Sequence, residues 1–338
     1  MKKKFLFFAV VSCVCLLISG GGYVCYAVRQ PAFELSETAS IYLYKNQNPL
    51  SELKAVGRLR QPIVYRLAAK LLRCPDAVRA GKYDLTPDMS YLDAVRMLRN
   101  GTQTPVRLTF NNIRTKKDFA ERIGKQLRFD ADSLLALLNN PQTAAAFELD
   151  TNTILTMFLP NTYEIYWTVS APQFMERMQR EYAHFWTSAR RSQAQAIGLT
   201  PTQVSILAAI VAEETNKADE YPMVAGLYLN RLNKKMLLQA DPTVKFAVGD
   251  FGLRRILNVH VQTDSPYNTY KYTGLPPGPI RIPSIPAIDG VLNRKQHNYL
   301  YMCAKEDFSG RHNFAVTYNE HLQNARRYHA ALNQRKIK

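Results

Sequence analysis

The sequence lacks the short motifs by which many classes of enzyme are identified. It contains no G-x-S-x-G nucleophile elbow, no phosphate-binding P-loop, no H-E-x-x-H zinc motif and no dinucleotide fingerprint. Its 6 histidines are scattered, and no Cys/His spacing is typical of a metal site. We therefore expect neither a metal nor a cofactor.

Cysteine is scarce. Of the 5 cysteines, Cys13, Cys15 and Cys25 lie close to the N-terminus, which leaves only Cys74 and Cys303 in the rest of the chain. These two cysteines could form one disulfide with each other. Their apolar contexts, CPDAV and YMCAK, suit buried thiols equally well, so both alternatives stand.

Acidic residues are outnumbered by basic ones, 27 to 44, and the formal net charge is +17. Such a balance favours an anionic partner: nucleic acid, an acidic membrane surface or an acidic polymer. The basic residues occur in short, dispersed groups, without an RNA-binding signature, zinc-finger spacing or a basic helix with a zipper. We therefore do not expect nucleic acid as a partner. A solvated basic surface without a partner is the alternative.

An apolar segment follows the N-terminal lysines Lys2, Lys3 and Lys4. It runs from Phe5 to Val28, about 24 residues, which is long enough to cross a bilayer. Positive charge on the short side places the N-terminus in the cytoplasm and the remainder outside. A cleaved signal peptide is the alternative, but no Ala-x-Ala-like site follows the segment. We expect residues 1–29 to be a cytoplasmic tip and an uncleaved single-pass anchor in the cell (inner) membrane.

Residues 30–110 have the pattern of a small α+β module. Two β-rich segments, Ile41–Tyr44 and Gly81–Leu85, enclose two helical segments, and Ser90 begins a further helix. This strand–helix–helix–strand order is similar to a LysM-like glycan-binding module in topology alone. A structural spacer is the alternative.

Residues 111–338 are predicted to form a mixed α+β domain around a buried helix. Thr200 is a suitable N-cap, Pro201 suits the first helical position, and Gln203 completes a capping box. The helix is apolar on most sides and ends in two adjacent acids, Glu213 and Glu214.

Glu214 shares a helical face with Leu207, Ile210 and Val211. Apolar surroundings disfavour the ionised form of a carboxyl group and raise its pKa. A general acid must still hold its proton near neutral pH, so this setting suits one. The alternative is that the helix simply ends here, with both glutamates solvated.

A polar, aromatic and proline-rich region follows this helix. Its segments Ser265–Tyr270 and Thr273–Pro279 contain few aliphatic residues, as functional loops often do. Asp241, directly before Pro242, fits a helix N-cap. Closer to the N-terminus than the buried helix, a further continuous helix is expected over Pro172–Arg190. An acid beside such a region suits cleavage of a carbohydrate polymer, because the leaving oxygen must be protonated and the sugar rings must be bound.

At these residues the sequence resembles the endolytic murein transglycosylases of the MltG (YceG-like) family. The matching stretches, in the family's order, are Leu159–Tyr163 (LPNTY), Ala208–Thr215 (AAIVAEET), Val224–Leu232 (VAGLYLNRL), Leu238–Thr243 (LQADPT), Tyr267–Tyr270 (YNTY) and Gly274–Gly278 (GLPPG). The chain departs from the family at Ala212, where an acid is frequent, and at Leu155–Thr156, where many relatives carry Glu-Gly.

The resemblance implies that Glu214 is the catalytic residue and that 111–338 is the catalytic domain. It implies glycan contacts from Gln239, Asp241, Tyr267, Asn268, Thr269 and Tyr270, with Asn230 and Thr215 supporting the acid. Glu214 would first protonate the glycosidic oxygen and then take the proton of the muramoyl 6-hydroxyl, closing a 1,6-anhydro ring.

The implied function is a membrane-anchored lytic transglycosylase that cuts the MurNAc-GlcNAc β-1,4 bond of nascent peptidoglycan strands and ends their elongation. Peptidoglycan, the membrane and a peptidoglycan synthase are its expected partners. Two alternatives stand beside it. One is a hydrolytic muramidase in which Asp241 or Asp219 directs water; the other is a non-catalytic peptidoglycan-binding scaffold.

Overall fold

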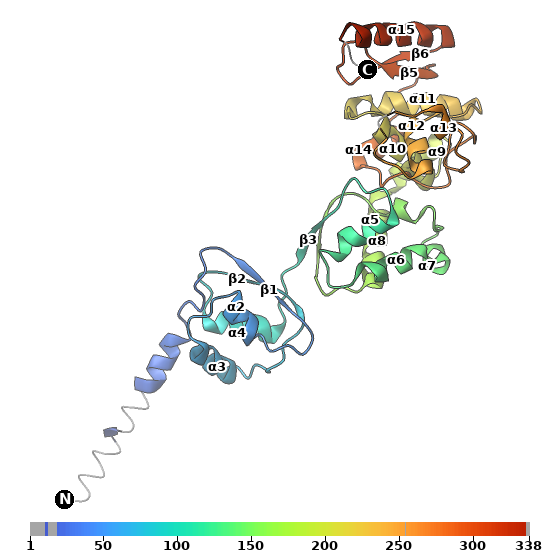
Figure 1. Cartoon of the computed structure of the whole chain (residues 1–338). Helices are drawn as coiled ribbons and strands as arrows, with labels where there is room; N and C mark the ends of the chain where they lie inside the picture. Colours follow the sequence, from blue (N-terminus) through green and yellow to red (C-terminus); the bar gives the residue numbers. More distant parts are fainter. Residues whose placement is uncertain (1–10, 13–18, 254, 336–338) are drawn as a thin grey trace, which may run out of the picture. The chain divides into compact units, whose positions relative to one another are not determined.

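The computed structural model describes residues 11–12, 19–253 and 255–335. The chain divides into two units (Figure 1). The first comprises residues 1–108, 126–128 and 163–169, and the second comprises residues 109–125, 129–162 and 170–338.

Most of the predicted anchor, residues 1–29, lies outside the described residues. Residues 19–27 are helical. In the described part of the chain, no single helix is long and apolar enough to cross a membrane. Two consecutive helices, Ser188–Ala196 and Pro201–Glu214, are together long and apolar enough to cross a membrane. They meet at a bend of 73°.

The first unit contains the predicted strand–helix–helix–strand order. Its elements are β1 (Ala39–Leu43), α2 (Leu50–Ala55), α3 (Pro62–Leu71), β2 (Gly81–Leu85) and α4 (Tyr91–Asn100). β1 and β2 pair antiparallel, with Ile41 opposite Tyr83, and both side chains are buried. The Ser90 hydroxyl accepts from the Asp93 N–H at the start of α4, and Gly101 ends the helix at a φ of 67°, a left-handed conformation that glycine adopts readily.

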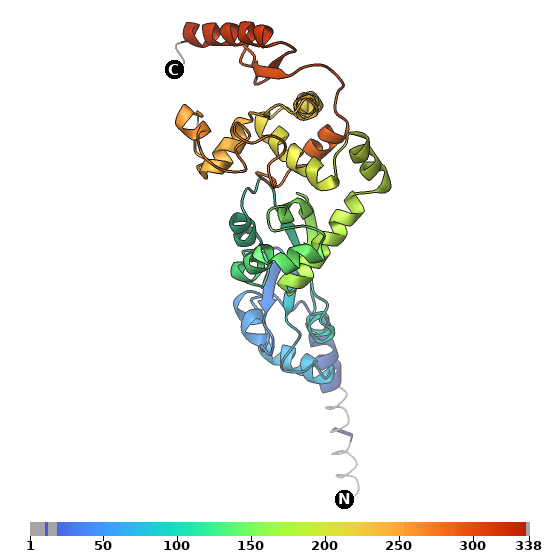
Figure 2. The ribbon, with the colours of Figure 1, turned by 90° about the vertical axis from the view of Figure 1, so that its right-hand side faces the viewer.

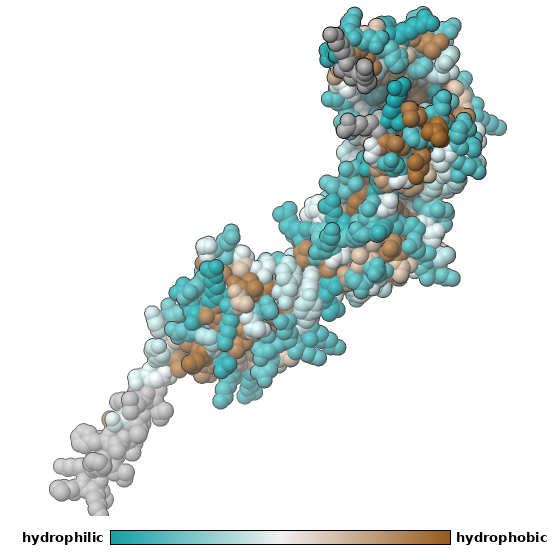
Figure 3. Space-filling model, in the orientation of Figure 1, coloured by the Kyte–Doolittle hydropathy of each residue, from teal (hydrophilic) through white to brown (hydrophobic). Residues whose placement is uncertain are grey.

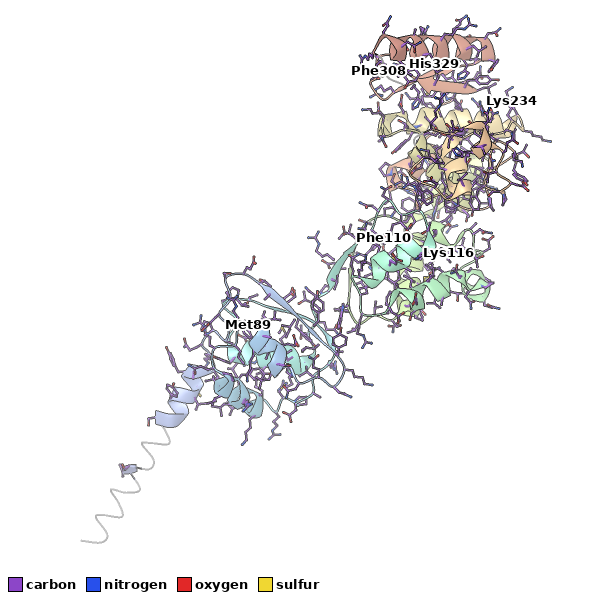
Figure 4. All side chains as sticks on the ribbon, in the orientation of Figure 1. Met89, Phe110, Lys116, Lys234, Phe308 and His329 are labelled. Atoms are coloured by element: carbon purple, nitrogen blue, oxygen red, sulfur yellow. The ribbon has the colours of Figure 1, made fainter. Side chains whose placement is uncertain are left out.

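Two short strands, β3 (Val106–Thr109) and β4 (Thr162–Ile165), form a second sheet. The helices of the second unit begin after β3. The first group, in chain order, is α5 (Lys116–Gly124), α6 (Ala131–Asn139), α7 (Pro141–Ala146), the 3-10 helix η1 (Ile154–Met157) and α8 (Ala171–Phe185). Phe119, on α5, packs against Phe110, Phe158 and Phe174 in a buried aromatic cluster. Figure 4 labels Phe110 and Lys116 in this group.

The prediction of one continuous helix over Pro172–Arg190 is wrong. α8 ends at Phe185, and α9 (Ser188–Ala196) begins after a break. The physical cause is local: Trp186 is buried in the core, and the Thr187 hydroxyl accepts from the Arg190 N–H as a new N-cap.

The remaining elements comprise one buried helix, the helices near it, and a C-terminal hairpin with the helix that covers it. They are α10 (Pro201–Glu214), η2 (Ala218–Glu220), α11 (Tyr221–Asn233), α12 (Asp241–Val248), α13 (Asn258–Val261), α14 (Ile285–Leu292), β5 (Tyr301–Ala304), β6 (His312–Ala315) and α15 (Tyr318–Gln334). Every residue of α10 from Val204 to Ala212 is buried, and α11, α12 and α14 pack against this helix. Full burial of one large aliphatic side chain contributes about 1.5–3 kcal/mol. α10 is therefore held in position chiefly by its neighbours.

The C-terminal elements form a hairpin covered by a helix. β5 and β6 pair antiparallel, and α15 lies along them (Figure 2). In the turn of the hairpin, Phe308, which is labelled in Figure 4, packs against Tyr328 of α15 and against Arg335, the C-cap residue of that helix. In the view of Figure 3 the surface is mainly hydrophilic, with scattered hydrophobic patches.

Candidate active site

The candidate site lies at the C-terminal end of α10. The helix begins with the predicted capping box: the Thr200 hydroxyl accepts from the Gln203 N–H at 3.2 Å, and the Gln203 side chain accepts from the Thr200 N–H at 2.9 Å. Glu214 is its last residue and Thr215 its C-cap. The sequence signals for this helix are local, and the structure confirms them.

The Glu214 carboxyl group has a strongly perturbed pKa. Dense surrounding protein removes water from this group and raises its pKa to about 7. The Tyr228 hydroxyl donates to Glu214 Oε1 at 2.7 Å and opposes the rise, whereas the negative charge of Asp241 adds to it. The pKa of Tyr228 is itself far above its usual range because of burial, so its hydroxyl stays protonated and acts as the donor.

Glu214 lines an open pocket of about 280 Å³. The lining residues come from α10, α11, the loop before α12, the start of α12, the loop between α13 and α14, and the β5–β6 hairpin. They are Glu214, Leu227, Tyr228, Arg231, Leu238, Gln239, Asp241, Tyr270, Met302, Cys303, Ala304 and His312. The pocket thus contains two carboxylates, two tyrosine hydroxyls, one arginine and one histidine.

Asp241 is directed into this pocket, and the N-cap interpretation of this residue is wrong. Ala240 occupies the N-cap position, and Asp241 is the first residue of α12. Its Oδ1 accepts instead from the Tyr270 hydroxyl at 2.6 Å. Burial, followed by the bond to Asp241, raises the pKa of Tyr270, which therefore remains a donor. The two residues form a polar pair beside Glu214.

Gln239 and Arg231 shape the adjacent wall. Gln239 has a φ of 51°, an uncommon left-handed conformation for a residue other than glycine. Its side-chain oxygen accepts from Arg231 Nη1 at 3.2 Å. Arg231 also donates to three main-chain carbonyls, those of Leu237, Leu238 and Leu300, so its guanidinium fixes the loop that carries Gln239.

Three of the residues predicted to bind glycan hold the loop that carries Tyr270. Thr269 is buried, and its hydroxyl accepts from the Ala240 N–H at 3.0 Å. Asn268 is also buried and donates to the carbonyls of Val261 and Thr263. Tyr267 packs against the ring of Phe246 at 4.7 Å. Of the YNTY stretch, Tyr270 is the residue that lines the pocket.

Asn230 and Thr215 have partners other than the acid. The Asn230 amide donates to the carbonyl oxygens of His297 at 2.7 Å and Tyr299 at 3.1 Å. The buried Thr215 hydroxyl donates to Glu220 at 3.0 Å. Within the described residues, these bonds fix segments next to the site rather than the Glu214 carboxyl group.

Glu213 is paired on another side of the helix end. Arg114 Nη2 lies 2.9 Å from its carboxylate and Arg281 Nη1 lies 2.6 Å from it. The interpretation in which both glutamates are solvated is therefore wrong. The two adjacent acids differ: Glu213 is neutralised by two guanidinium groups, and Glu214 is held at a raised pKa.

Sequence reasoning missed two parts of the site. Tyr228 and Arg231 lie within the VAGLYLNRL stretch, three residues apart and therefore on one face of the helix, so helical spacing could have placed both near the acid. The hairpin residues Met302, Cys303 and His312 carried no signal, because their position depends on contacts far apart in the chain.

Cys25, Cys74 and Cys303 are free thiols, so the disulfide alternative is wrong. Burial raises the pKa of Cys303, which disfavours its thiolate. Over the part of the chain that the structure describes, no group of three or more His, Cys, Asp or Glu side chains is arranged to hold a metal ion.

Fold and site together define an α+β protein with an acid pocket at the end of a buried helix. Residues 45–327 match the YceG-like family, and the chain belongs to that family. The structure is similar to that of a YceG-like protein from Listeria monocytogenes, with a TM-score of 0.57 and 25% identity, over 85% of this chain and 99% of that one.

Relatives from two species carry the name endolytic murein transglycosylase. The Bacillus subtilis (strain 168) protein is 40% identical over 130 residues, which are 38% of this chain and 35% of that protein. The protein of Streptococcus pneumoniae serotype 2 is 25% identical over 331 residues, covering 85% of this chain and 59% of that protein. The chain thus spans only part of the length of these two relatives.

Proposed function

We propose that this protein is a lytic transglycosylase that cleaves the MurNAc-GlcNAc β-1,4 bond of peptidoglycan and leaves 1,6-anhydroMurNAc ends. One observation carries the proposal: Glu214 has a pKa of about 7 and lines an open polar pocket. A carboxyl group with that pKa is present in both protonation states near neutral pH, as a residue that must act first as acid and then as base requires. Relatives named endolytic murein transglycosylase support it.

In the proposed first step, protonated Glu214 gives its proton to the glycosidic oxygen. The bond from C1 of the muramoyl residue to that oxygen breaks, and an oxocarbenium-like sugar remains. Because Tyr228 donates to Oε1, Oε2 is the oxygen that carries the acid proton. Tyr228 thus orients the acid as well as moderating its pKa.

In the second step, the Glu214 carboxylate accepts the proton of the muramoyl 6-hydroxyl, and that oxygen bonds to C1. Glu214 ends the cycle protonated, and no water is consumed. The Asp241–Tyr270 pair and Gln239 lie in the same pocket and supply hydrogen-bonding groups for the sugar. The negative charge of Asp241 also favours the positively charged sugar.

The proposed cellular setting follows from the N-terminal segment. Residues 1–29 would anchor the protein in the cell membrane with its N-terminus in the cytoplasm, and the pocket would act on nascent strands outside. Cutting there would end glycan elongation beside a peptidoglycan synthase. The net charge of +17 suits a polymer whose stem peptides carry carboxylates. The first unit, with its LysM-like order of elements, would bind glycan.

The test is product chemistry. Purified full chain, wild type beside Glu214→Gln, is incubated with isolated peptidoglycan, and the products are identified by mass spectrometry. The wild type is expected to generate anhydromuramoyl ends and the variant none. If wild-type digests carry no new ends of either kind, the protein is a scaffold.

A hydrolytic muramidase is the second candidate, because Asp241 brings another carboxylate into the pocket of Glu214. Asp219 does not line this pocket; it is paired at 2.8 Å with Arg311 on the surface. Hydrolysis would require Asp241 to direct a water molecule to C1. Reducing ends in place of anhydro ends, lost in Asp241→Asn, would establish this candidate.

A further inference from the structure

A buried carboxylate joins the end of α10 to the hairpin. Glu220, at the end of η2, is only 7% exposed. Its Oε1 accepts from the His312 main-chain N–H at 3.0 Å, and its Oε2 lies 3.1 Å from His312 Nδ1 and 3.0 Å from the Thr215 hydroxyl. Residues 92 apart in the sequence are thus bound together next to the catalytic acid.

These bonds determine which nitrogen of the His312 ring carries a hydrogen. Burial raises the pKa of Glu220, but the bonds from His312 and Thr215 outweigh it and leave that pKa below its usual value. An ionised carboxylate only accepts hydrogen bonds, so Nδ1 must be the donor. In the neutral ring, Nε2 is therefore the acceptor, and its direction is fixed by the bond at Nδ1.

His312 also lines the pocket of Glu214. Its side chain is 15% exposed, and it shares the pocket with Asp241, Tyr270 and Gln239. The hairpin that carries it is secured to Glu220 through both main chain and side chain, so the ring is pre-organised before a ligand arrives. The mechanism proposed above assigns it no task.

We propose that His312 is a substrate-contacting residue of the pocket, whose Nε2 hydrogen-bonds a hydroxyl group of the glycan, and that Glu220 and Thr215 are its positioning residues. This inference rests on the proposed action on glycan strands. A sugar hydroxyl is a suitable partner, because it can either donate to or accept from a ring nitrogen and leaves the Nδ1 bond unchanged.

Two substitutions separate the two ring nitrogens. In His312→Asn the side-chain amide can take the place of Nδ1 and still donate to Glu220, but nothing replaces Nε2. In His312→Gln the longer side chain carries its amide towards the position of Nε2. His329→Asn is the matched control, because His329 is exposed on α15 (Figure 4).

Binding is measured in the Glu214→Gln background, so that no strand is cut. The probe is linear glycan strands released from peptidoglycan and freed of stem peptides, titrated by calorimetry. Adding His312→Asn is expected to weaken binding about tenfold, the effect of one lost hydrogen bond, with part of it restored in His312→Gln. The His329→Asn control is expected to bind as the background does.

A purely structural role of His312 in the hairpin predicts a different result. If His312 only holds the hairpin, His312→Gln, which loses the bond to Glu220, will lower the melting temperature. Neither variant will then change the Kd of the folded protein, and that result would overturn the inference. Unchanged binding with an unchanged melting temperature would overturn it as well. The proposed function fails separately: a wild type that binds strands without forming anhydro ends refutes transglycosylation and leaves the contact of His312 intact.

Discussion

Glu214 and its four neighbours determine what one carboxyl group can do. Removal of water raises the Glu214 pKa, Tyr228 and Arg231 lower it, and Asp241 and Glu213 raise it. The outcome, about 7, lies near the middle of the range in which donation and acceptance of a proton are both accessible. Each neighbouring group can be removed by a single substitution, so its contribution to the Glu214 pKa can be measured.

The first prediction concerns stability. The Glu214 pKa is about 7 in the folded protein against an ordinary 4.5, so the folded state holds this proton more tightly. Stability therefore falls as pH rises between these values, by up to about 3 kcal/mol in all. Glu214→Gln keeps the acceptor for Tyr228 and removes the titration.

In urea unfolding, Glu214→Gln should be more stable than wild type at about pH 8 and similar to it at about pH 4. The difference should grow from pH 4.5 upward and level off above pH 7. A difference that is independent of pH would contradict the assigned pKa.

The second prediction concerns Tyr228. Its hydroxyl bond favours ionised Glu214, so Tyr228→Phe raises the Glu214 pKa further. The alkaline limb of the pH–kcat profile, where the acid loses its proton, should move to higher pH. A loss of about tenfold in kcat is also expected, because a hydrogen bond to a charged group is removed. Steady-state rates over a pH series measure both.

The third prediction is the opposite shift. Asp241 is the neighbouring negative charge that raises the Glu214 pKa, so Asp241→Asn should move the alkaline limb to lower pH. The amide can still accept from Tyr270, which keeps the local geometry. Parallel shifts in Tyr228→Phe and Asp241→Asn would show that these two groups do not act on Glu214 in the manner described.

Among the elements, α10 could be predicted almost residue by residue, whereas the hairpin could not. The start of α10 depends on Thr200, Pro201 and Gln203, which lie next to one another, and its burial follows from its own composition. The position of β6 depends on Glu220, Thr215 and their bonds to His312, which no local pattern encodes. Local signals therefore predicted the acid, and only tertiary contacts revealed the opposite wall of its pocket.

Local signals also failed where two of them compete. A short polar side chain before proline is typical of an N-cap, and Asp241 has that pattern. In the structure the Asp241 carboxylate accepts from the Tyr270 hydroxyl, and Ala240, which occupies the N-cap position of α12, makes no side-chain cap bond. The distant partner prevails over the local one.

The fourth prediction concerns α11, which carries Tyr228 and Arg231. A Cβ atom at Gly226 would meet the Lys295 carbonyl oxygen and would lie 2.6 Å from His297 Nε2. Main chain cannot yield as a flexible side chain does, so Gly226→Ala should destabilise the protein by about 1–3 kcal/mol. Thermal unfolding measures the loss. Gly198→Ala is a poor control because Gly198 has a positive φ. Ala330→Ser, at an exposed position on α15, is a suitable control. An equal loss of stability in Gly226→Ala and Ala330→Ser would contradict the close approach at Gly226.

At the scale of the whole molecule, the two units have separate cores, and the pocket belongs entirely to the second. A domain boundary at residue 110 stays a prediction from the sequence; the first long segment of the first compact unit ends at residue 108. The sequence did not predict that residues 126–128 and 163–169 belong to the first unit, because those short segments join it only through tertiary contacts.

The central claim is that Glu214 closes an anhydro ring without the use of water. The most direct measurement is a digest of peptidoglycan by the full chain in water enriched in the heavy isotope of oxygen, read by mass spectrometry. The account predicts anhydromuramoyl ends without the isotope, and no new ends with Glu214→Gln. Reducing ends that carry the isotope would contradict it, as would unchanged products from the variant.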